Sequence, residues 1–159
     1  MNHIYLSLGS NIGDRQAHLQ QALQELESAK IQILRVSRIY ETEPYGYRAQ
    51  AWFLNLVAEV ETTQLPFHLL NTIHRIERKL KRHRIFRNGP RTIDIDIVFY
   101  RNAVINTPTL QIPHPRYKER AFVLAPLSDL ISTGQPHRPP RVYSPSDLRS
   151  SNACATPQG

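Results

Sequence analysis

Two aspartates stand two residues apart in the segment 92–100, which reads TIDIDIVFY. This segment predicts a strand, and side chains at positions i and i+2 of a strand point to the same face, roughly 6.6 Å apart. Asp94 and Asp96 therefore share one face, and Ile93, Ile95 and Ile97 take the other. Two such carboxylates repel each other unless a cation or solvent screens them. Mg²⁺ suits this arrangement, because it takes one or two carboxylates and completes its shell with phosphate oxygens and water. The alternative is an ordinary strand with one solvated face.

A basic stretch precedes the aspartates. The chain carries 20 Lys and Arg against 13 Asp and Glu, a formal net charge of +7. Residues 75–91 hold eight of the basic residues and one acid, Glu77, so this stretch alone accounts for the net charge. Arginine recognises phosphate through planar, bidentate hydrogen bonds. The combination outlines a metal-assisted phosphate site, and the absence of a G-x-x-x-x-G-K-[ST] run excludes a P-loop. From charge alone, a solvated basic helix end and loop is an equally good interpretation.

A second candidate set combines aromatic rings with one amide. Aromatic faces beside an amide suit a flat heterocycle with hydrogen-bonding edges. Phe53 and Phe122 could equally be core residues, and His114, on an expected loop, could simply be exposed. The set comprises Tyr45, Tyr47, Trp52, Phe53, Asn55 and Phe122.

The elements that must position these residues follow from hydrophobic periodicity. Asp14 is a plausible N-cap, and Pro66 suits the first turn of a helix. The order predicts an α+β, ferredoxin-like βαββαβ fold: a four-stranded antiparallel sheet with helices on one face, plus a C-terminal helix. Such a sheet leaves its other face open for a ligand. We expect strands over 3–8, 31–40, 52–62 and 92–100, and helices over 14–28, 66–82 and 116–131.

Length and composition limit the class of protein. A chain of 159 residues with 40% hydrophobic residues predicts one domain, over 1–131, with a core of its own. Residues 132–159 are rich in Pro and Ser and predict a weakly structured tail. No apolar run approaches the ~20 residues that a membrane span needs, no signal peptide is recognised, and Cys154 is the single cysteine. We therefore expect a cytoplasmic monomer with no membrane or nucleic-acid partner.

Residues 87–98 read RNGPRTIDIDIV. This segment resembles the signature of the 6-hydroxymethyl-7,8-dihydropterin pyrophosphokinase family of folate biosynthesis, since G-P-R followed by two spacers and D-x-D is a highly specific combination. The resemblance covers residues 3 to about 131. Further segments that agree are LGSNIGD at 8–14, YETEP at 40–44, FLN at 53–55, RIE at 75–77, RHR at 82–84, PH at 113–114 and RAF at 120–122.

The resemblance implies an ATP-dependent diphosphokinase. Its reaction would transfer the β,γ-pyrophosphate of ATP to the hydroxymethyl oxygen of 6-hydroxymethyl-7,8-dihydropterin and release AMP. Two Mg²⁺ ions per site, held by Asp94 and Asp96, would bridge ATP and the pterin hydroxyl. The other implied roles are charge stabilisation by Arg82 and Arg91, ATP binding by Glu77, Arg84, His114 and Arg120, and pterin binding by Thr42, Pro44, Tyr45, Phe53, Asn55 and Phe122.

Two other functions share some of these features. A ferredoxin-like sheet could bind RNA through residues 75–91 and stack bases on surface aromatics, although the sequence has no RNP1-like run. A two-metal phosphohydrolase or nuclease would use the same aspartates, but the chain lacks the three or more metal-ligating acids or histidines that such a site requires.

Overall fold

The structure is a computed structural model that describes residues 3–43, 49–80, 92–131 and 141–143. Its helices are α1 (Arg15–Ser28), α2 (Pro66–Lys79) and α3 (Ala121–Ser128), with a 3₁₀ turn at Tyr117–Glu119. Its strands are β1 (Ile4–Ser10), β2 (Gln32–Val36), β3 (Ile39–Thr42), β4 (Phe53–Glu61), β5 (Asp94–Tyr100), β6 (Ile105–Asn106), β7 (Gln111–Ile112) and β8 (Arg141–Tyr143).

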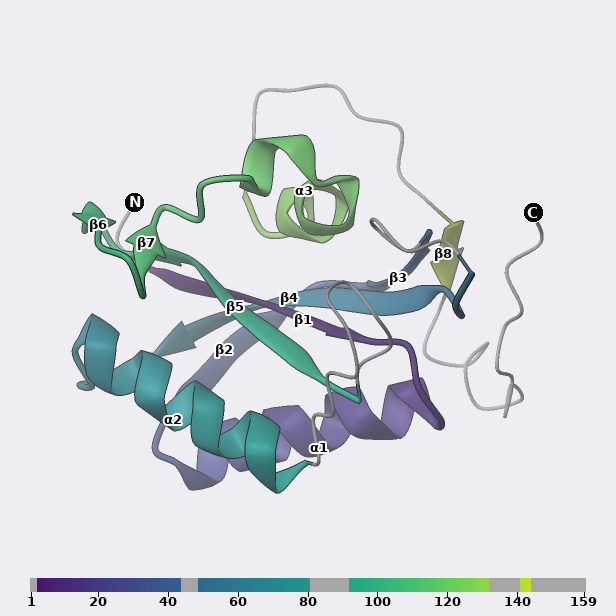
Figure 1. Ribbon diagram of the computed structural model, residues 1–159, viewed down its shortest axis with the longest axis horizontal. Helices are drawn as coiled ribbons and strands as arrows, with labels where there is room; N and C mark the ends of the chain where they lie inside the picture. The colour runs from purple at the N-terminus through teal and green to yellow at the C-terminus, as the bar shows by residue number, and fades with distance from the viewer. Residues whose placement is uncertain (1–2, 44–48, 81–91, 132–140, 144–159) are drawn as a thin grey trace.

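The main sheet is antiparallel, which confirms the α+β class, and its strands follow the order β5–β1–β4–β3–β8, with β2 also paired to β4 (Figure 1). Six strands replace the four that we predicted. One addition is β8, which comes from the stretch expected to be a tail and pairs with β3. The other arises because the expected strand 31–40 is divided at Ser37. There the Ser37 hydroxyl accepts from the backbone N–H of Val57 at 2.9 Å and donates to the carbonyl of Arg38 at 2.8 Å.

The helices begin where local chemistry favours it, with one exception. Asp14 caps α1 by accepting from the N–H of Ala17 at 3.1 Å, and Pro66 opens α2, as predicted. The prediction of one helix over 116–131 is wrong in its first part. The backbone of Arg120 is extended, with φ −109° and ψ 102°, so the 3₁₀ turn ends there and α3 begins only at the next residue.

The sheet lies between two layers of helices. Figure 1 shows α1 and α2 on one face and α3 on the other. A large core cluster fills the α1–α2 side, and a smaller one lies under α3, where Tyr5, Val57, Val98 and Phe99 meet Val123 and Leu127. The second face of the sheet is therefore only partly open, because α3 covers one end of it.

Hydrogen bonds to Asp129, at the end of α3, attach this helix to the sheet. Arg38 donates to Asp129 from its backbone N–H at 3.0 Å and from its guanidinium at 2.9 Å, and the hydroxyl of Tyr40 donates at 2.9 Å. Burial raises the pKa of Asp129, but these hydrogen bonds outweigh it, so the pKa lies below its ordinary value. None of the helices within the described ranges has the length and apolar character to cross a membrane.

Candidate active site

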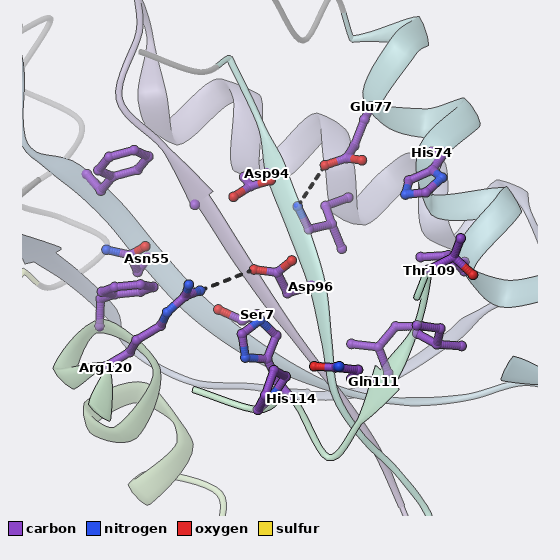
Figure 2. Close-up of a pocket in the computed structure, with 18 of the residues that line it drawn as sticks. Ser7, Asn55, His74, Glu77, Asp94, Asp96, Thr109, Gln111, His114 and Arg120 are labelled. Carbon is purple, nitrogen blue, oxygen red and sulfur yellow. Dashed lines mark hydrogen bonds and ion pairs between the residues drawn. The ribbon is translucent and has the colours of Figure 1, made fainter. Parts of the chain in front are cut away.

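A cavity of about 580 Å³ opens on the sheet beside α3 and continues around β5, the end strand of the sheet. This volume suits a small-molecule ligand. Figure 2 shows that the cavity has two sides, with Asn55 and Arg120 on the sheet side of β5 and His74, Thr109 and Gln111 toward α2. The aspartates of β5 lie between these two sides.

Asp94 and Asp96 occupy the start of β5 and line the cavity together. Ile93, Ile95 and Ile97 belong to the core on the α1–α2 side, which confirms the alternation predicted from the sequence. The side chain of Asp96 is 38% exposed, and its Oδ2 lies 3.9 Å from a guanidinium nitrogen of Arg120. An accessible pair of carboxylates beside a cation is a donor set that fits Mg²⁺ and the phosphates that accompany it.

A metal ion at this pair would draw its other ligands from substrate and water. Over the described residues, no three His, Cys, Asp or Glu side chains come together as a closed metal-binding group. Mg²⁺ is commonly bound in this open way, by one or two carboxylates plus substrate phosphates.

The sheet side of the cavity is lined by an amide and two aromatic rings. Asn55 is 3% exposed, and its Nδ2 donates to the hydroxyl of Thr42 at 2.6 Å. Its Oδ1 lies over Gly9, where a Cβ would come within 2.7 Å of that oxygen. Phe53, two residues before Asn55, and Phe122, on α3, also line this side. The arrangement combines flat apolar walls with a fixed hydrogen-bonding group, which is suited to a planar heterocycle.

The α2 side is organised by Glu77 and His114. Glu77 is 6% exposed, and its Oε2 accepts from the backbone N–H of Ile95 at 3.1 Å (Figure 2). Burial and the charge of Arg120 lower the pKa of His114 to about 4, although Asp94 opposes the shift. The Nδ1 of His114 accepts from the N–H of Arg116 at 3.2 Å, which assigns the proton of the neutral ring to Nε2. His114 is therefore a hydrogen-bond donor without charge near neutral pH.

Of the candidate site residues predicted from the sequence, all of those that the structure describes except Trp52 line this one cavity. Six others, Arg82, Arg84, Arg91, Pro44, Tyr45 and Tyr47, lie outside the described residues. Trp52, from the aromatic set, is not among the lining residues. The nine that line the cavity are Thr42, Phe53, Asn55, Glu77, Asp94, Asp96, His114, Arg120 and Phe122.

The cavity also includes residues that sequence reasoning missed. Ser7 is 6% exposed and faces the cavity from β1, in register with Asp96. A polar residue in the otherwise apolar strand IYLSLG, two places before Gly9, was the available signal. No local signal marks Leu70 or the segment Pro108–Gln111, which reaches the cavity because β6 and β7 pair with each other.

Comparison with known proteins identifies the family of this chain. The sequence model of 7,8-dihydro-6-hydroxymethylpterin-pyrophosphokinase (HPPK) matches residues 5–132. A 2-amino-4-hydroxy-6-hydroxymethyldihydropteridine pyrophosphokinase of Bacillus subtilis is 49% identical over 132 residues, which are 82% of this chain and 79% of that protein. One of the same name from Aquifex aeolicus is 40% identical over 82% of this chain and 81% of that protein.

Longer proteins contain a similar region. The chain is 42% identical to part of a folic acid synthesis protein of Pneumocystis carinii, over 80% of this chain and 17% of that protein. Among solved structures, a Plasmodium falciparum HPPK-DHPS with pteroate superposes with a TM-score of 0.63 at 18% identity, over 80% of this chain and 38% of that one. The structural likeness supports the fold.

Proposed function

This chain belongs to the 7,8-dihydro-6-hydroxymethylpterin-pyrophosphokinase family, and on that premise we propose how its cavity carries out the reaction. As a member it is a pyrophosphokinase of folate biosynthesis that uses ATP as a substrate. We propose that it transfers the β,γ-pyrophosphate of ATP to the hydroxymethyl oxygen of 6-hydroxymethyl-7,8-dihydropterin. In this step the oxygen bonds to the β-phosphorus, the link from that phosphorus to AMP breaks, and the hydroxyl proton passes to solvent.

The observation that carries the proposal is the position of Asp94 and Asp96 between the two sides of one cavity. The reacting groups must meet between the heterocycle and the nucleotide. Asp94 and Asp96 would hold two Mg²⁺ ions there, and these would supply charge neutralisation on the phosphates and a lower pKa for the pterin hydroxyl. Phosphoryl transfer depends mainly on positioning and charge stabilisation, so the site requires no dedicated nucleophile.

The sheet side would bind the pterin. Asn55, fixed by Thr42 at 2.6 Å, would hydrogen-bond the edge of the ring system, and Phe53 and Phe122 would contact its faces. We also propose contacts from Pro44 and Tyr45, on the resemblance alone. A rigid amide selects a heterocycle with complementary donors and acceptors, because a mismatched ring leaves a buried polar group unpaired.

The α2 side would bind ATP. Neutral His114 can donate from Nε2 to a phosphate without adding charge, while Arg120, next to Asp96, contributes a permanent cation. Glu77 keeps its carboxylate on the backbone of β5 and thereby shapes the nucleotide wall. The resemblance adds Arg84 to this group and gives Arg82 and Arg91 the role of stabilising charge on the transferred group.

Several broader properties complete the proposal. The strands β1, β4 and β5, with β2 and β3 taken together, support a ferredoxin-like arrangement in which β8 and α3 are additions. We place the protein in the cytoplasm, consistent with its single cysteine, and propose that it acts as a monomer on small molecules. The alternative of an RNA-binding module finds no support in the comparisons.

The test is AMP formation from Mg·ATP, with and without 6-hydroxymethyl-7,8-dihydropterin. We expect AMP only when the pterin is present, and none after EDTA removes the metal. Release of inorganic phosphate or AMP at the same rate without pterin would contradict the proposal and favour a phosphohydrolase.

A further inference from the structure

Arg15 stands at a helix position that disfavours its charge. It is the first residue of α1, where the helix dipole disfavours a cation, and no acid accompanies it in that first turn. It is also 5% exposed, although arginine is almost never fully buried without a partner. A buried cation at a helix N-terminus indicates that tertiary contacts hold it there.

Those contacts reach both strands that flank the connection 43–52. One guanidinium nitrogen of Arg15 lies 3.2 Å from the carboxylate of Glu41 on β3, and both side chains are 4% exposed. The other donates to the carbonyl of Trp52, directly before β4, at 2.8 Å. A single side chain thus joins the end of one strand to the start of the next.

The two contacts enclose the last cross-strand pair of the β3–β4 ladder. Glu41 precedes Thr42, Trp52 precedes Phe53, and Thr42 pairs with Phe53 in the register. Side chains alternate along a strand, so Glu41 points to the α1 side while Thr42 points to the cavity. Arg15 therefore bonds, on the α1 face of the sheet, to the residues next to Thr42 and Phe53. These two residues line the cavity on the opposite face.

Asn11, in the loop before α1, reinforces the same junction. Its Nδ2 donates to Oε1 of Gln50 at 2.8 Å and to the carbonyl of Ala51 at 3.0 Å. We call Asn11, Arg15, Glu41 and Gln50 the clamp. All four are less than 9% exposed, and together they bind the chain from 50 to 52 to the start of α1.

We propose that Arg15 is a positioning residue for the heterocycle: the clamp holds Thr42, and through it Asn55, in the geometry that binds the pterin. The link to Asn55 is its 2.6 Å hydrogen bond to Thr42. Arg15 does not line the cavity, so the proposal gives it no direct contact with the substrate. The inference rests on the proposed function, because it assigns the sheet side of the cavity to the pterin.

The proposal predicts a selective loss of affinity. Arg15→Lys keeps the positive charge, but one ammonium does not reproduce the planar fork that serves Glu41 and Trp52 together. We expect binding of 6-hydroxymethylpterin to weaken about tenfold, less than the roughly 100-fold that a 1 Å displacement can cost at a reacting centre. Binding of α,β-methylene-ATP, whose α–β bridge cannot be cleaved, is expected to stay within about twofold, because the ATP side is built from α2 and the 108–115 segment.

The matched control is Arg35→Lys. Arg35 also bridges a carboxylate and a carbonyl, those of Glu59 and Leu130, but at the β2 edge and away from the cavity. The same chemical change there is expected to alter neither affinity. Both variants and the wild type are measured by titration calorimetry, with Mg²⁺ present, after thermal unfolding has shown that each is folded.

Each result of this experiment has a meaning. If the wild type binds the ATP analogue but no pterin, the proposed function fails. If the wild type binds both and Arg15→Lys keeps its pterin affinity, or loses both affinities equally, the positioning role is refuted. If Arg15→Lys does not fold, Glu41→Gln, which keeps shape and an acceptor oxygen, replaces it with the same expected selectivity and the same grounds for rejection.

Discussion

At the scale of single residues, the two aspartates of β5 are partly exposed and carry like charges on one face of the strand. Asp96 is more than a third exposed and lies beside Arg120, and Asp94 shares its face. Without a cation, the two carboxylates repel each other. A carboxylate pair whose mutual repulsion a bound metal ion would relieve is typical of a functional site.

Asp96→Asn is therefore expected to separate activity from stability. The amide keeps the shape of the side chain but removes a metal-binding charge, so AMP formation should fall at least about 100-fold, since metal stabilisation is worth several kcal/mol. Thermal unfolding without metal should show an unchanged or higher midpoint, because repulsion with Asp94 is removed. Full activity in this variant would reject the metal-binding role of Asp96.

His114 makes stability depend on pH. Its pKa of about 4 in the folded protein lies below the ordinary value of 6.5, so between these values the unfolded chain binds more protons and stability falls as pH falls. The metal-free protein should lose about 2 kcal/mol from this residue between pH 6.5 and pH 4, a value that discounts the full shift for partial exposure of the ring.

His114→Gln isolates that contribution. Urea unfolding at pH 7 and pH 5 should show a smaller pH dependence in the variant than in the wild type, because glutamine does not titrate. Identical pH dependence in the two proteins would show that the ring titrates normally in the fold.

At the scale of elements, the close approach of β1 and β4 fixes the Asn55 amide, which we propose recognises the heterocycle. Gly9 pairs with Asn55 in the ladder, and the space above it is filled by the Oδ1 of Asn55. Any side chain at this position would displace the amide from its hydrogen bond with Thr42.

Gly9→Ala should consequently weaken pterin binding about tenfold, the value of roughly one hydrogen bond, while affinity for α,β-methylene-ATP stays unchanged. Fluorescence titration with 6-hydroxymethylpterin measures the first and calorimetry the second. Equal affinities in variant and wild type would show that the amide moves aside without a functional cost.

The same scale shows what the sequence could predict. The alternation of TIDIDIV was sufficient to place both aspartates on the cavity side, since every second residue faces the core. The division of the expected strand 31–40 was not predictable, because the Ser37 hydroxyl accepts a hydrogen bond from the backbone of Val57 only when β4 lies beside it. Neither was the clamp, since Arg15 and Glu41 are 26 residues apart and meet only in the folded chain. Helix α3 starts late for a similar reason: Arg120 extends beside Asp96, a partner from another element.

At the scale of the whole molecule, the net charge is confined to one basic segment, and the rest of the sequence is neutral in sum. Residues 75–91 account for the net charge of +7, so the excess charge is local. Beyond residue 131 the described part of the chain adds only β8, which pairs with the outer side of β3. The family match also ends at residue 132.

We therefore expect a chain ending at Ile131 to fold and to stay active. Turnover should remain within about threefold of the full chain, and the unfolding midpoint should fall by a few degrees, about 1 kcal/mol for the loss of a three-residue edge strand. Circular dichroism and the AMP assay test both statements. An unfolded or inactive truncation would show that 132–159 belongs to the domain.

The bond between Glu77 and the backbone of Ile95 has a consequence outside catalysis. Within the described residues, β5 is one of the end strands of the sheet. The outward N–H groups of an end strand are a template on which strands of other molecules can align. A buried carboxylate from α2 occupies one of these donors and sets a negative charge along the edge. The side of the cavity that we propose for the nucleotide thus also occupies one pairing position of this edge. We expect replacement of Glu77 with an apolar residue to reduce solubility at high protein concentration as well as ATP binding.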